Sequence, residues 1–477
     1  MSSSPAGEWA SRLASRSQTA RIAIVGGGLA GLNAAYQLQK VGLPATLYEA
    51  KARVGGRIQS RPGLVMPGLV NDLGAAFINS DHYDVLSLVQ ELGLELFDRR
   101  CLTETSPLPE MAFFFAGRRI DPAELAFTLA PLATQVAHDQ QRLAENFDRY
   151  APRLDALSVA DYLDLHGQKM RQGYGRSLIE ASIRTEYGVE ADQASALQLL
   201  YNLPQVRGQR VDPLAADELF TVKGGSGLIP QRLAAHLGDG VQTGWRLQAV
   251  TQVGEGFQLR FTQGSVAADY VILALPFPAL RRIDLQVPLP DGLRQFIQEG
   301  GPGRNEKLFA GFSQRPWLGA NGFTGAAWSD MGYSGLWEDT QRQPEYPQGV
   351  LTFFLGGNEV PAADGGIQTQ GQGFVDQLGI YLPDLGASVT HRYARTAWGQ
   401  DPDFGGSYTN FRPGQYTRFR DFLYAEATPP GQGRGAQVGN LLFAGEQFSE
   451  AYYGYMNGAA QTGRLAAAAL TQRLLAT

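Results

Sequence analysis

The chain has 477 residues, of which 44% are hydrophobic and 18% charged, with a formal net charge of −6 at pH 7. This length exceeds one ordinary hydrophobic core and predicts two or three domains. The slight acidity argues against a nucleic-acid partner, whose phosphates need a strong basic excess. A single cysteine, Cys101, excludes an internal disulfide and a thiolate metal cluster, and the five histidines show no metal-like spacing. These counts predict no metal site. No apolar run reaches the ~18 residues of a membrane span, so we expect a cytoplasmic protein.

The first 20 residues are rich in Ser, Ala and Arg and predict a disordered leader. A β-branched run, Ile22 to Val25, then predicts a buried strand, and a helical pattern resumes at Leu29. Three glycines between the strand and the first helical turn fit the spacing G-x-G-x-x-G, namely Gly26, Gly28 and Gly31. The first allows the tight turn, the second lets a pyrophosphate approach the backbone, and the third lets the helix pack on the strand.

An acidic residue completes this unit. A second strand, Ala45 to Tyr48, ends in Glu49, which follows Gly31 by 18 residues. That is close to the ~20 residues expected of the acid that binds a ribose hydroxyl. The helix start adds free N–H groups and the positive end of its dipole for the phosphates. The sequence therefore predicts a βαβ unit that binds a dinucleotide.

The rest of the chain alternates helical and strand-like segments. A cationic, glycine-containing loop covers residues 51–58, and helical periodicity covers residues 83–97 and 122–185. Later strand-like runs are Trp245–Val250, Phe257–Phe261, Tyr270–Leu275, Leu308–Phe312 and Val350–Leu355. A short strand around Leu441 and an Ala-rich helix from about Met456 close the chain. We assign residues 21–80, 215–285 and 426–477 to the nucleotide-binding domain, and residues 81–214 and 286–425 to a substrate-binding domain.

Several separated motifs lie along this pattern. They are Gly26–Gly31 with Arg53–Arg57, Val70–Phe77, Arg246–Val250, Asn305–Leu308, Ala397–Pro402 with Gly405–Tyr408, and Phe443–Glu446 with Tyr453–Ala459. In this order they resemble the flavin-dependent amine oxidase superfamily, which comprises monoamine oxidases, polyamine oxidases and L-amino-acid oxidases. The resemblance covers nearly the whole chain after residue 20. It implies an α/β fold with a Rossmann-like FAD-binding domain of the glutathione-reductase type, interleaved with an α+β substrate domain.

The resemblance also assigns residues to FAD. In the family the acid binds the adenosine ribose, the Gly-Gly-Arg loop holds the pyrophosphate, and the last helix aims its N-terminus at the flavin. The residues so assigned are Gly26, Gly28, Gly31, Glu49, Ala50, Arg57, Gly74, Ala75, Ala76, Val250, Trp398, Glu446, Tyr455 and Met456. Val250 is the one expected to grip the adenine through its backbone. Some relatives attach FAD to a cysteine where this chain has Ser407, so we expect FAD to be bound without a covalent link.

Three residues are expected to carry the chemistry. Lys307 matches the lysine that holds a water against the reactive flavin nitrogen, and Tyr408 and Tyr455 match an aromatic cage in front of the flavin. Aromatic faces orient an amine nitrogen and attract cationic forms of the substrate. The residues expected to contact substrate are Phe77, Asn79, Glu186, Tyr408 and Tyr455.

The chain departs from L-amino-acid oxidases at Phe77. Those relatives have an arginine there, which clamps the substrate carboxylate with paired hydrogen bonds. Its absence favours a plain amine or a polyamine, although Arg184 or Arg392 could replace it. A polyamine needs acidic partners for its distal ammonium groups. The candidates are Glu186, Glu190, Asp192, Asp81, Asp84, Glu338 and Glu450.

We therefore expect FAD-dependent oxidation of an amine or polyamine to an imine and then an aldehyde, with dioxygen reduced to hydrogen peroxide. If the amine arrives neutral, no strong general base is needed and the rate rises with pH. The first alternative is an L-amino-acid oxidase, and a more distant one is an FAD-dependent desaturase or isomerase. A flavoprotein that only binds a partner or stores the cofactor is the non-enzyme alternative. The expected partners are a small amine and dioxygen, with no nucleic acid and no membrane; the oligomeric state, a homodimer included, stays open.

Overall fold

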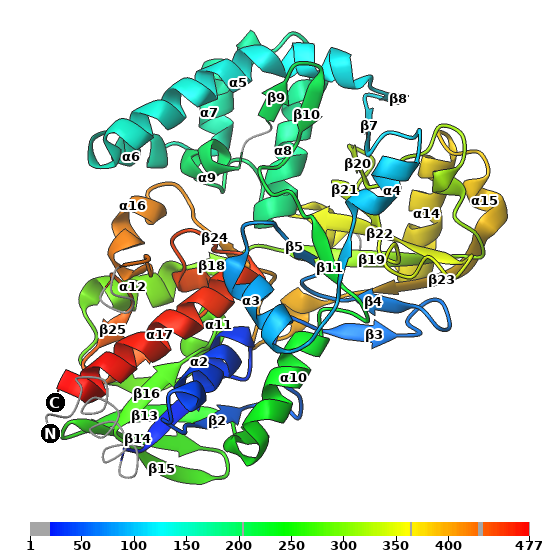
Figure 1. Ribbon diagram of the computed structural model, residues 1–477. Coiled ribbons are helices and arrows are strands. Elements are labelled where there is room, and N and C mark those ends of the chain that lie inside the picture. Colours follow the sequence, from blue (N-terminus) through cyan, green and yellow to red (C-terminus); the bar gives the residue numbers. More distant parts are fainter. Residues whose placement is uncertain (1–19, 203–204, 363–364, 428–432, 477) are drawn as a thin grey trace, which may run out of the picture.

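The computed structural model describes residues 20–202, 205–362, 365–427 and 433–476. Apart from Ala20, the predicted leader lies outside the described residues. The described chain contains a largely parallel sheet flanked by helices, a second and mainly antiparallel sheet, and a layer of helices (Figure 1). The predicted α/β class is confirmed.

The first sheet is assembled from three stretches that lie far apart in the sequence. In spatial order its strands are β12 (Val241–Thr243), β2 (Thr46–Glu49), β1 (Ile22–Val25), β16 (Tyr270–Leu273), β26 (Leu441–Phe443) and β25 (Gln437–Val438). All neighbours run parallel except β25. Every residue of β1 and β16 is buried, as expected of parallel strands covered on both faces.

Helices and a small sheet pack around this first sheet. The helices are α2 (Leu29–Lys40), α10 (Leu228–Leu237) and α17 (Met456–Ala476), and α17 lies beside α2 (Figure 1). The small sheet consists of β15 (Gly264–Ala268), β14 (Gly256–Phe261), β13 (Leu247–Val253) and β17 (Asp284–Gln286). It packs on the parallel sheet through aromatic contacts, with the rings of Tyr48 and Phe261 4.6 Å apart.

The second sheet has seven strands. They are β23 (Val389–Arg395), β19 (Asn305–Phe312), β22 (Gly349–Gly356), β21 (Gly335–Glu338), β20 (Ala326–Ser329), β7 (Met111–Phe115) and β8 (Arg118–Arg119). Only β20 and β7 pair in parallel. All eight residues of β19 and of β22 are buried, because α14 (Ile367–Gly379) contacts this sheet and α8 (Tyr174–Tyr187) also packs against it.

Helices form a further layer at the top of the molecule in Figure 1, and α8 of this layer packs on the second sheet. They are α5 (Pro122–Glu145), α6 (Phe147–Asp155), α7 (Val159–His166), α8 and α9 (Ala196–Tyr201). Local signals fix their ends: Asp121 caps α5, Ser158 and Asp161 form a capping box at α7, and Gly188 ends α8 at φ +65°. None of the helices in the described ranges is long and apolar enough to cross a bilayer.

Shorter elements connect these layers. The helices are α3 (Tyr83–Glu91), α4 (Arg100–Thr105), α11 (Phe277–Leu280), α12 (Asp291–Glu299), α13 (Glu359–Ala362), α15 (Leu385–Ser388) and α16 (Gln415–Phe419). The strands are β3 (Ser60–Pro62), β4 (Val70–Asp72), β5 (Phe77–Ile78), β6 (Leu96–Asp98), β9 (Gln205–Arg207), β10 (Arg210–Asp212), β11 (Phe220–Val222), β18 (Gly301–Pro302) and β24 (Thr409–Asn410).

The predicted helix over residues 83–97 is too long. Helix α3 ends at Glu91, and Gly93 follows with φ +62°, a conformation that costs a residue with a Cβ. The chain then enters β6, which pairs with β11. The boundaries between the two predicted domains stay a prediction.

Candidate active site

A cavity of about 550 Å³ lies among the first sheet, the second sheet and α8. It includes the carboxyl ends of β1, β2 and β16, where open α/β sheets place their ligands. The structure brings all the predicted site residues to its wall except two, Gly31 and Val250.

The glycine turn forms one end of the cavity. A Cβ at Gly26 would collide with the Ala274 carbonyl oxygen, and one at Gly31 with the Gly26 carbonyl oxygen. At Gly28 a Cβ would meet no atom of the described residues within 4 Å, so the backbone is open there. Helix α2 starts at the next residue, Leu29, and no side chain among the described residues caps its first turn. The free N–H groups at this end suit a pyrophosphate.

Glu49 lies at the end of β2 beside this turn. Its carboxylate accepts hydrogen bonds from the N–H groups of Gly27 (2.7 Å) and Lys51 (2.8 Å). A carboxylate retains acceptor capacity after two such bonds, so Glu49 can still bind ribose hydroxyls. Its orientation is therefore fixed before a ligand arrives.

The contact of the Val250 backbone with the adenine stays a prediction. Val250 is fully buried in β13 and is not among the residues that line the cavity. The same segment reaches the cavity earlier, at Trp245–Gln248. Leu247, Ala249 and Val250 are all buried in β13, and the pairing of β13 with β14 is irregular between Leu247 and Ala249.

Arg57 ties the early loop to two late segments. Its guanidinium donates to the Ser407 carbonyl and to Glu446 Oε1, the latter at 3.1 Å. Glu446 also accepts hydrogen bonds from Thr409 Oγ1 (3.0 Å) and Gly454 N–H (2.8 Å). These hydrogen bonds connect the loop that contains Arg57 to the segments that contain Ser407 and Glu446.

No cysteine lines the cavity, so no thiol is available there to form a thioether with the cofactor. Ser407 lines the cavity where some relatives have cysteine, and its hydroxyl donates to Asn305 Oδ1 at 2.7 Å. The only cysteine of the chain, Cys101, is exposed in α4 and does not line the cavity. A cofactor in this cavity is therefore bound without a covalent link to sulfur.

The segment after β4 crosses the middle of the cavity. Gly74, Ala75 and Ala76 line it, and a Cβ at Gly74 would collide with the Arg57 carbonyl oxygen. Trp398 packs against this segment and donates its indole N–H to the Leu73 carbonyl at 3.2 Å. Small residues here leave room for a planar ring beside the backbone.

Lys307 projects from β19 to this segment and is 5% exposed. Its ammonium donates to the carbonyls of Asp72 (2.8 Å) and Gly74 (2.7 Å). An ammonium has three N–H groups, so one remains for a water or a ligand in the cavity. Burial lowers the pKa of Lys307 below its ordinary value, and the carboxylates of Asp339 and Asp72 oppose that shift.

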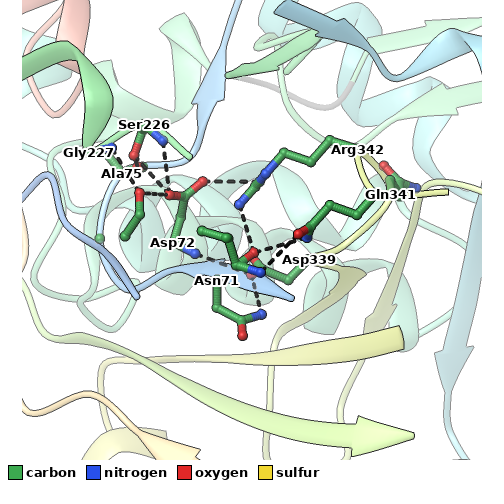
Figure 2. Close-up of polar contacts among 12 residues, drawn as sticks. Asn71, Asp72, Ala75, Ser226, Gly227, Asp339, Gln341 and Arg342 are labelled. Atoms are coloured by element: carbon green, nitrogen blue, oxygen red, sulfur yellow. Dashed lines mark hydrogen bonds and ion pairs between the residues drawn. The ribbon is translucent and has the colours of Figure 1, made fainter. Parts of the chain in front are cut away.

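Asp72, Asp339 and Arg342 form a buried ionic cluster (Figure 2), and Lys307 donates to the backbone carbonyl of Asp72. Arg342 Nη1 is 3.1 Å from Asp72 Oδ2, with both side chains at most 2% exposed. Asn71 Nδ2 donates to Asp339 Oδ2 at 2.7 Å, and Ser226 N–H donates to Asp72 Oδ1 at 3.0 Å. Burial raises the pKa of Asp339. With Lys307, two cations balance two carboxylates in the interior, as buried charges require.

Two tyrosines form one wall of the cavity. Tyr408 donates its hydroxyl to the Thr185 carbonyl, and Tyr455 donates to Glu186 Oε2 at 2.5 Å. Burial raises the pKa of both tyrosines well above the ordinary value, and the carboxylates of Glu186 and Glu218 add to the shift. The field at this wall therefore favours a cation or an amine.

Aromatic and acidic side chains complete the wall. Phe77 packs edge-on against Trp337 with ring centroids 5.2 Å apart, and Phe354 lines the cavity beside them. The sequence did not point to Glu218, whose side chain lines the cavity and whose φ is +44°. Asn79 holds it there, because Asn79 Oδ1 accepts the Glu218 N–H at 3.0 Å.

Most of the other candidates lie elsewhere. Of the seven acids proposed for distal ammonium groups, only Glu186 lines the cavity. Asp84, Glu190, Glu338 and Glu450 are paired with arginines, and Asp81 and Asp192 are exposed. Neither candidate arginine lines the cavity, because Arg184 pairs with Glu190 at 2.8 Å and Arg392 is exposed on β23.

Comparisons with known proteins agree with this geometry. A family model described as flavin containing amine oxidoreductase matches residues 29–471. The chain is 26% identical to an L-amino acid dehydrogenase of Synechocystis sp., over 94% of each chain. It is 23% identical to amine oxidase A of Sus scrofa, covering 94% of this chain and 84% of that one. The solved cyclohexylamine oxidase of Brevibacterium oxydans IH-35A has the same fold, with a TM-score of 0.78 at 23% identity over 95% of this chain and 99% of that one. The chain belongs to the flavin-containing amine oxidoreductases, and it is an oxidoreductase that carries FAD.

Proposed function

We propose that this protein oxidises an amine without an α-carboxylate to its imine, and that dioxygen is the electron acceptor, giving hydrogen peroxide. The observation that carries this proposal is the charge at the tyrosine wall. Glu186 and Glu218 are the carboxylates that act on both Tyr408 and Tyr455. Such a wall attracts an ammonium group and repels a carboxylate.

The side chains divide the work between cofactor and substrate. Bound FAD supplies the acceptor for the hydride that leaves the α-carbon of the amine. The open backbone at Gly28 and the guanidinium of Arg57 are placed for its pyrophosphate, and Glu49 is placed for its ribose. Tyr408 and Tyr455 orient the amine and exclude water. Lys307 offers its third N–H to a water that can hydrolyse the imine.

Gly28 gives a test of the cofactor site. Gly28→Ala is expected to weaken FAD binding by about 1–3 kcal/mol, because a methyl group would occupy the space of the pyrophosphate. The apoprotein should unfold at the wild-type temperature, since Gly28 has φ −74° and a Cβ there has room. Titration of apoprotein with FAD, followed by flavin fluorescence, measures the change.

A matched variant is Gly373→Ala in α14, where a Cβ also meets no described atom within 4 Å. It should leave FAD affinity unchanged and raise stability by about 1 kcal/mol, the helix propensity difference between the two residues. Unchanged FAD affinity in Gly28→Ala would place the pyrophosphate elsewhere.

The proposed substrate class is tested by a pair of compounds. Under anaerobic conditions, phenethylamine is expected to bleach the flavin at least about tenfold faster than L-phenylalanine at equal concentration. The amino acid would bury its extra carboxylate near Glu186 and Glu218, where the nearby Arg99 is already paired with Glu218 at 3.6 Å, and this costs more than about 1.4 kcal/mol. Stopped-flow absorbance at the flavin band measures both rates. Faster bleaching by the amino acid would favour the L-amino-acid oxidase instead.

Two further statements rest on the sequence and stay proposals. We place the protein in the cytoplasm, and we name a small amine and dioxygen as its partners. Peroxide release during turnover in air separates dioxygen from another acceptor.

A further inference from the structure

The hydroxyl groups of Tyr408 and Tyr455 donate hydrogen bonds to two consecutive residues of one helix. Tyr408 donates to the carbonyl of Thr185 and Tyr455 to the carboxylate of Glu186, in the last turn of α8. This turn is fixed by Gly188, which closes α8 in the left-handed conformation. The last turn of α8 therefore accepts a hydrogen bond from each tyrosine, and Glu186 is one of the two acceptors.

One carboxylate oxygen of Glu186, Oε2, accepts hydrogen bonds from the described residues, and the other, Oε1, does not. Within the described residues, the hydrogen bonds to this carboxylate all go to Oε2, from Tyr455 at 2.5 Å and from Asn202 Nδ2 at 3.5 Å. The side chain lines the cavity. Oε1 is therefore the oxygen available to a group that enters the tyrosine wall.

The guanidinium of Arg99 lies 3.6 Å from Glu218 Oε2. Among the described residues, the ionisable groups that interact with Glu186 itself are carboxyl and phenol groups. They are Glu218 from the loop before β11, Tyr187 from α8 itself, Tyr408, and Tyr453 and Tyr455 from the segment before α17. Burial raises the pKa of Glu186 to about 7, with the Tyr455 hydroxyl opposing the shift and Glu218 adding to it. Near neutral pH this carboxyl can both gain and lose a proton.

We propose that Glu186 accepts the proton of the substrate ammonium before the amine is oxidised. In this step an N–H bond of the ammonium breaks and an O–H bond forms at Oε1 of Glu186. The electron pair stays on nitrogen, which gives a neutral amine and a neutral carboxylic acid. The proposal rests on the proposed function, because the amine must be a substrate.

The chemistry of alkylamines requires such a step. An alkylamine is mostly protonated at neutral pH, and its ammonium has no free electron pair to assist departure of hydride from the α-carbon. The aromatic wall binds the cation well, so a nearby base is needed to convert it. This revises the expectation that no general base takes part. The ratio of the rate constant for flavin reduction to the amine dissociation constant should then become level above about pH 7, instead of rising up to the pKa of the amine.

The experiment is anaerobic stopped-flow reduction of the holoenzyme by phenethylamine as a function of pH. The ratio of the limiting reduction rate constant to the amine dissociation constant reports ionisations of free enzyme and free amine. The wild type should show an acid limb near pH 7. Glu186→Gln keeps an acceptor for Tyr455 but cannot take the proton. It should be slower by about 10²-fold near neutral pH and should approach the wild type at alkaline pH.

Two variants shift the limb in opposite directions. Glu218→Gln removes the charge that raises the pKa of Glu186, so the acid limb should move to lower pH. Tyr455→Phe removes the donor that lowers this pKa, so the limb should move to higher pH. A merely structural role for Glu186 predicts neither movement, and this pair decides the question if Glu186→Gln does not fold.

The failures are distinguishable. A Glu186→Gln profile parallel to the wild-type profile, or an acid limb that neither other variant moves, would overturn the role of Glu186. Flavin that no amine bleaches at any pH would instead overturn the proposed function.

Discussion

Replacing Lys307 with methionine is expected to slow oxidation of the reduced enzyme by dioxygen by about 10²-fold, the usual effect of losing one preorganised donor at a developing negative charge. Lys307 is buried, and two of its N–H groups are held by the carbonyls of Asp72 and Gly74. Its charge is therefore fixed in place before dioxygen is reduced. Methionine has a similar length and no charge. Mixing anaerobically reduced enzyme with oxygenated buffer measures the rate.

The same preparation contains its own control. Anaerobic reduction by phenethylamine should change only a few-fold in Lys307→Met, because Glu186 and the tyrosine wall are untouched, and the flavin should stay bound. In the wild type, reoxidation should also slow at alkaline pH, since burial places the pKa of Lys307 below its ordinary value. If reduced Lys307→Met reacted with dioxygen at the wild-type rate, Lys307 would have no role in reoxidation.

Arg342→Met is expected to lower the free energy of unfolding by about 3–5 kcal/mol, the cost of removing one partner of a buried ion pair. Arg342 and Asp72 are both almost fully buried, and Asp339 shares the site (Figure 2). The variant leaves two interior carboxylates with Lys307 as the remaining cation of the cluster. Chemical denaturation of the holoenzyme measures the loss.

The pH dependence of this loss has a definite sign. Burial already raises the pKa of Asp339, and removal of Arg342 takes away a charge that lowers it. A carboxyl with a raised folded pKa contributes stability below its unfolded pKa and loses it as pH rises through the folded pKa. The defect should therefore be smaller in mild acid than at neutral pH.

Two further variants separate the pair from general charge loss. Asp72→Asn in the Arg342→Met background should restore part of the stability, because the double change removes both charges. Lys40→Met breaks an exposed pair with Glu91 at 2.9 Å and should cost less than about 1 kcal/mol. Equal effects of Lys40→Met and Arg342→Met would contradict the argument.

The βαβ unit was predictable because its signals are local. Strand β1, helix α2 and strand β2 appear where the pattern places them, and a Cβ at Gly26 or Gly31 would collide with backbone. Lys307, Tyr408 and Tyr455 could be predicted as site residues only from the resemblance to a known family. Nothing in the sequence around each of them shows that they lie in one cavity. The structure brings them to one cavity from β19, the segment before β24 and the segment before α17.

Other features depend on contacts that no local pattern reveals. Glu218 reaches the cavity only because Asn79 and Arg99, from a distant stretch, bind its backbone N–H and carbonyl. The pairing of Asp72 with Arg342 joins residues 270 positions apart. The sequence also could not show which of the acidic candidates for substrate binding line the cavity. An acid that pairs with an arginine and an acid that faces a ligand are the same residue in the sequence.

The arrangement of the parallel sheet has a consequence for synthesis. Strand β1 pairs with β16, which pairs with β26, and α2 is covered by α17. The sheet and its helical cover are therefore incomplete until β26 and α17 have been synthesised. We expect stable FAD binding only after that point, and we expect prematurely terminated chains to be targets for chaperones and proteases.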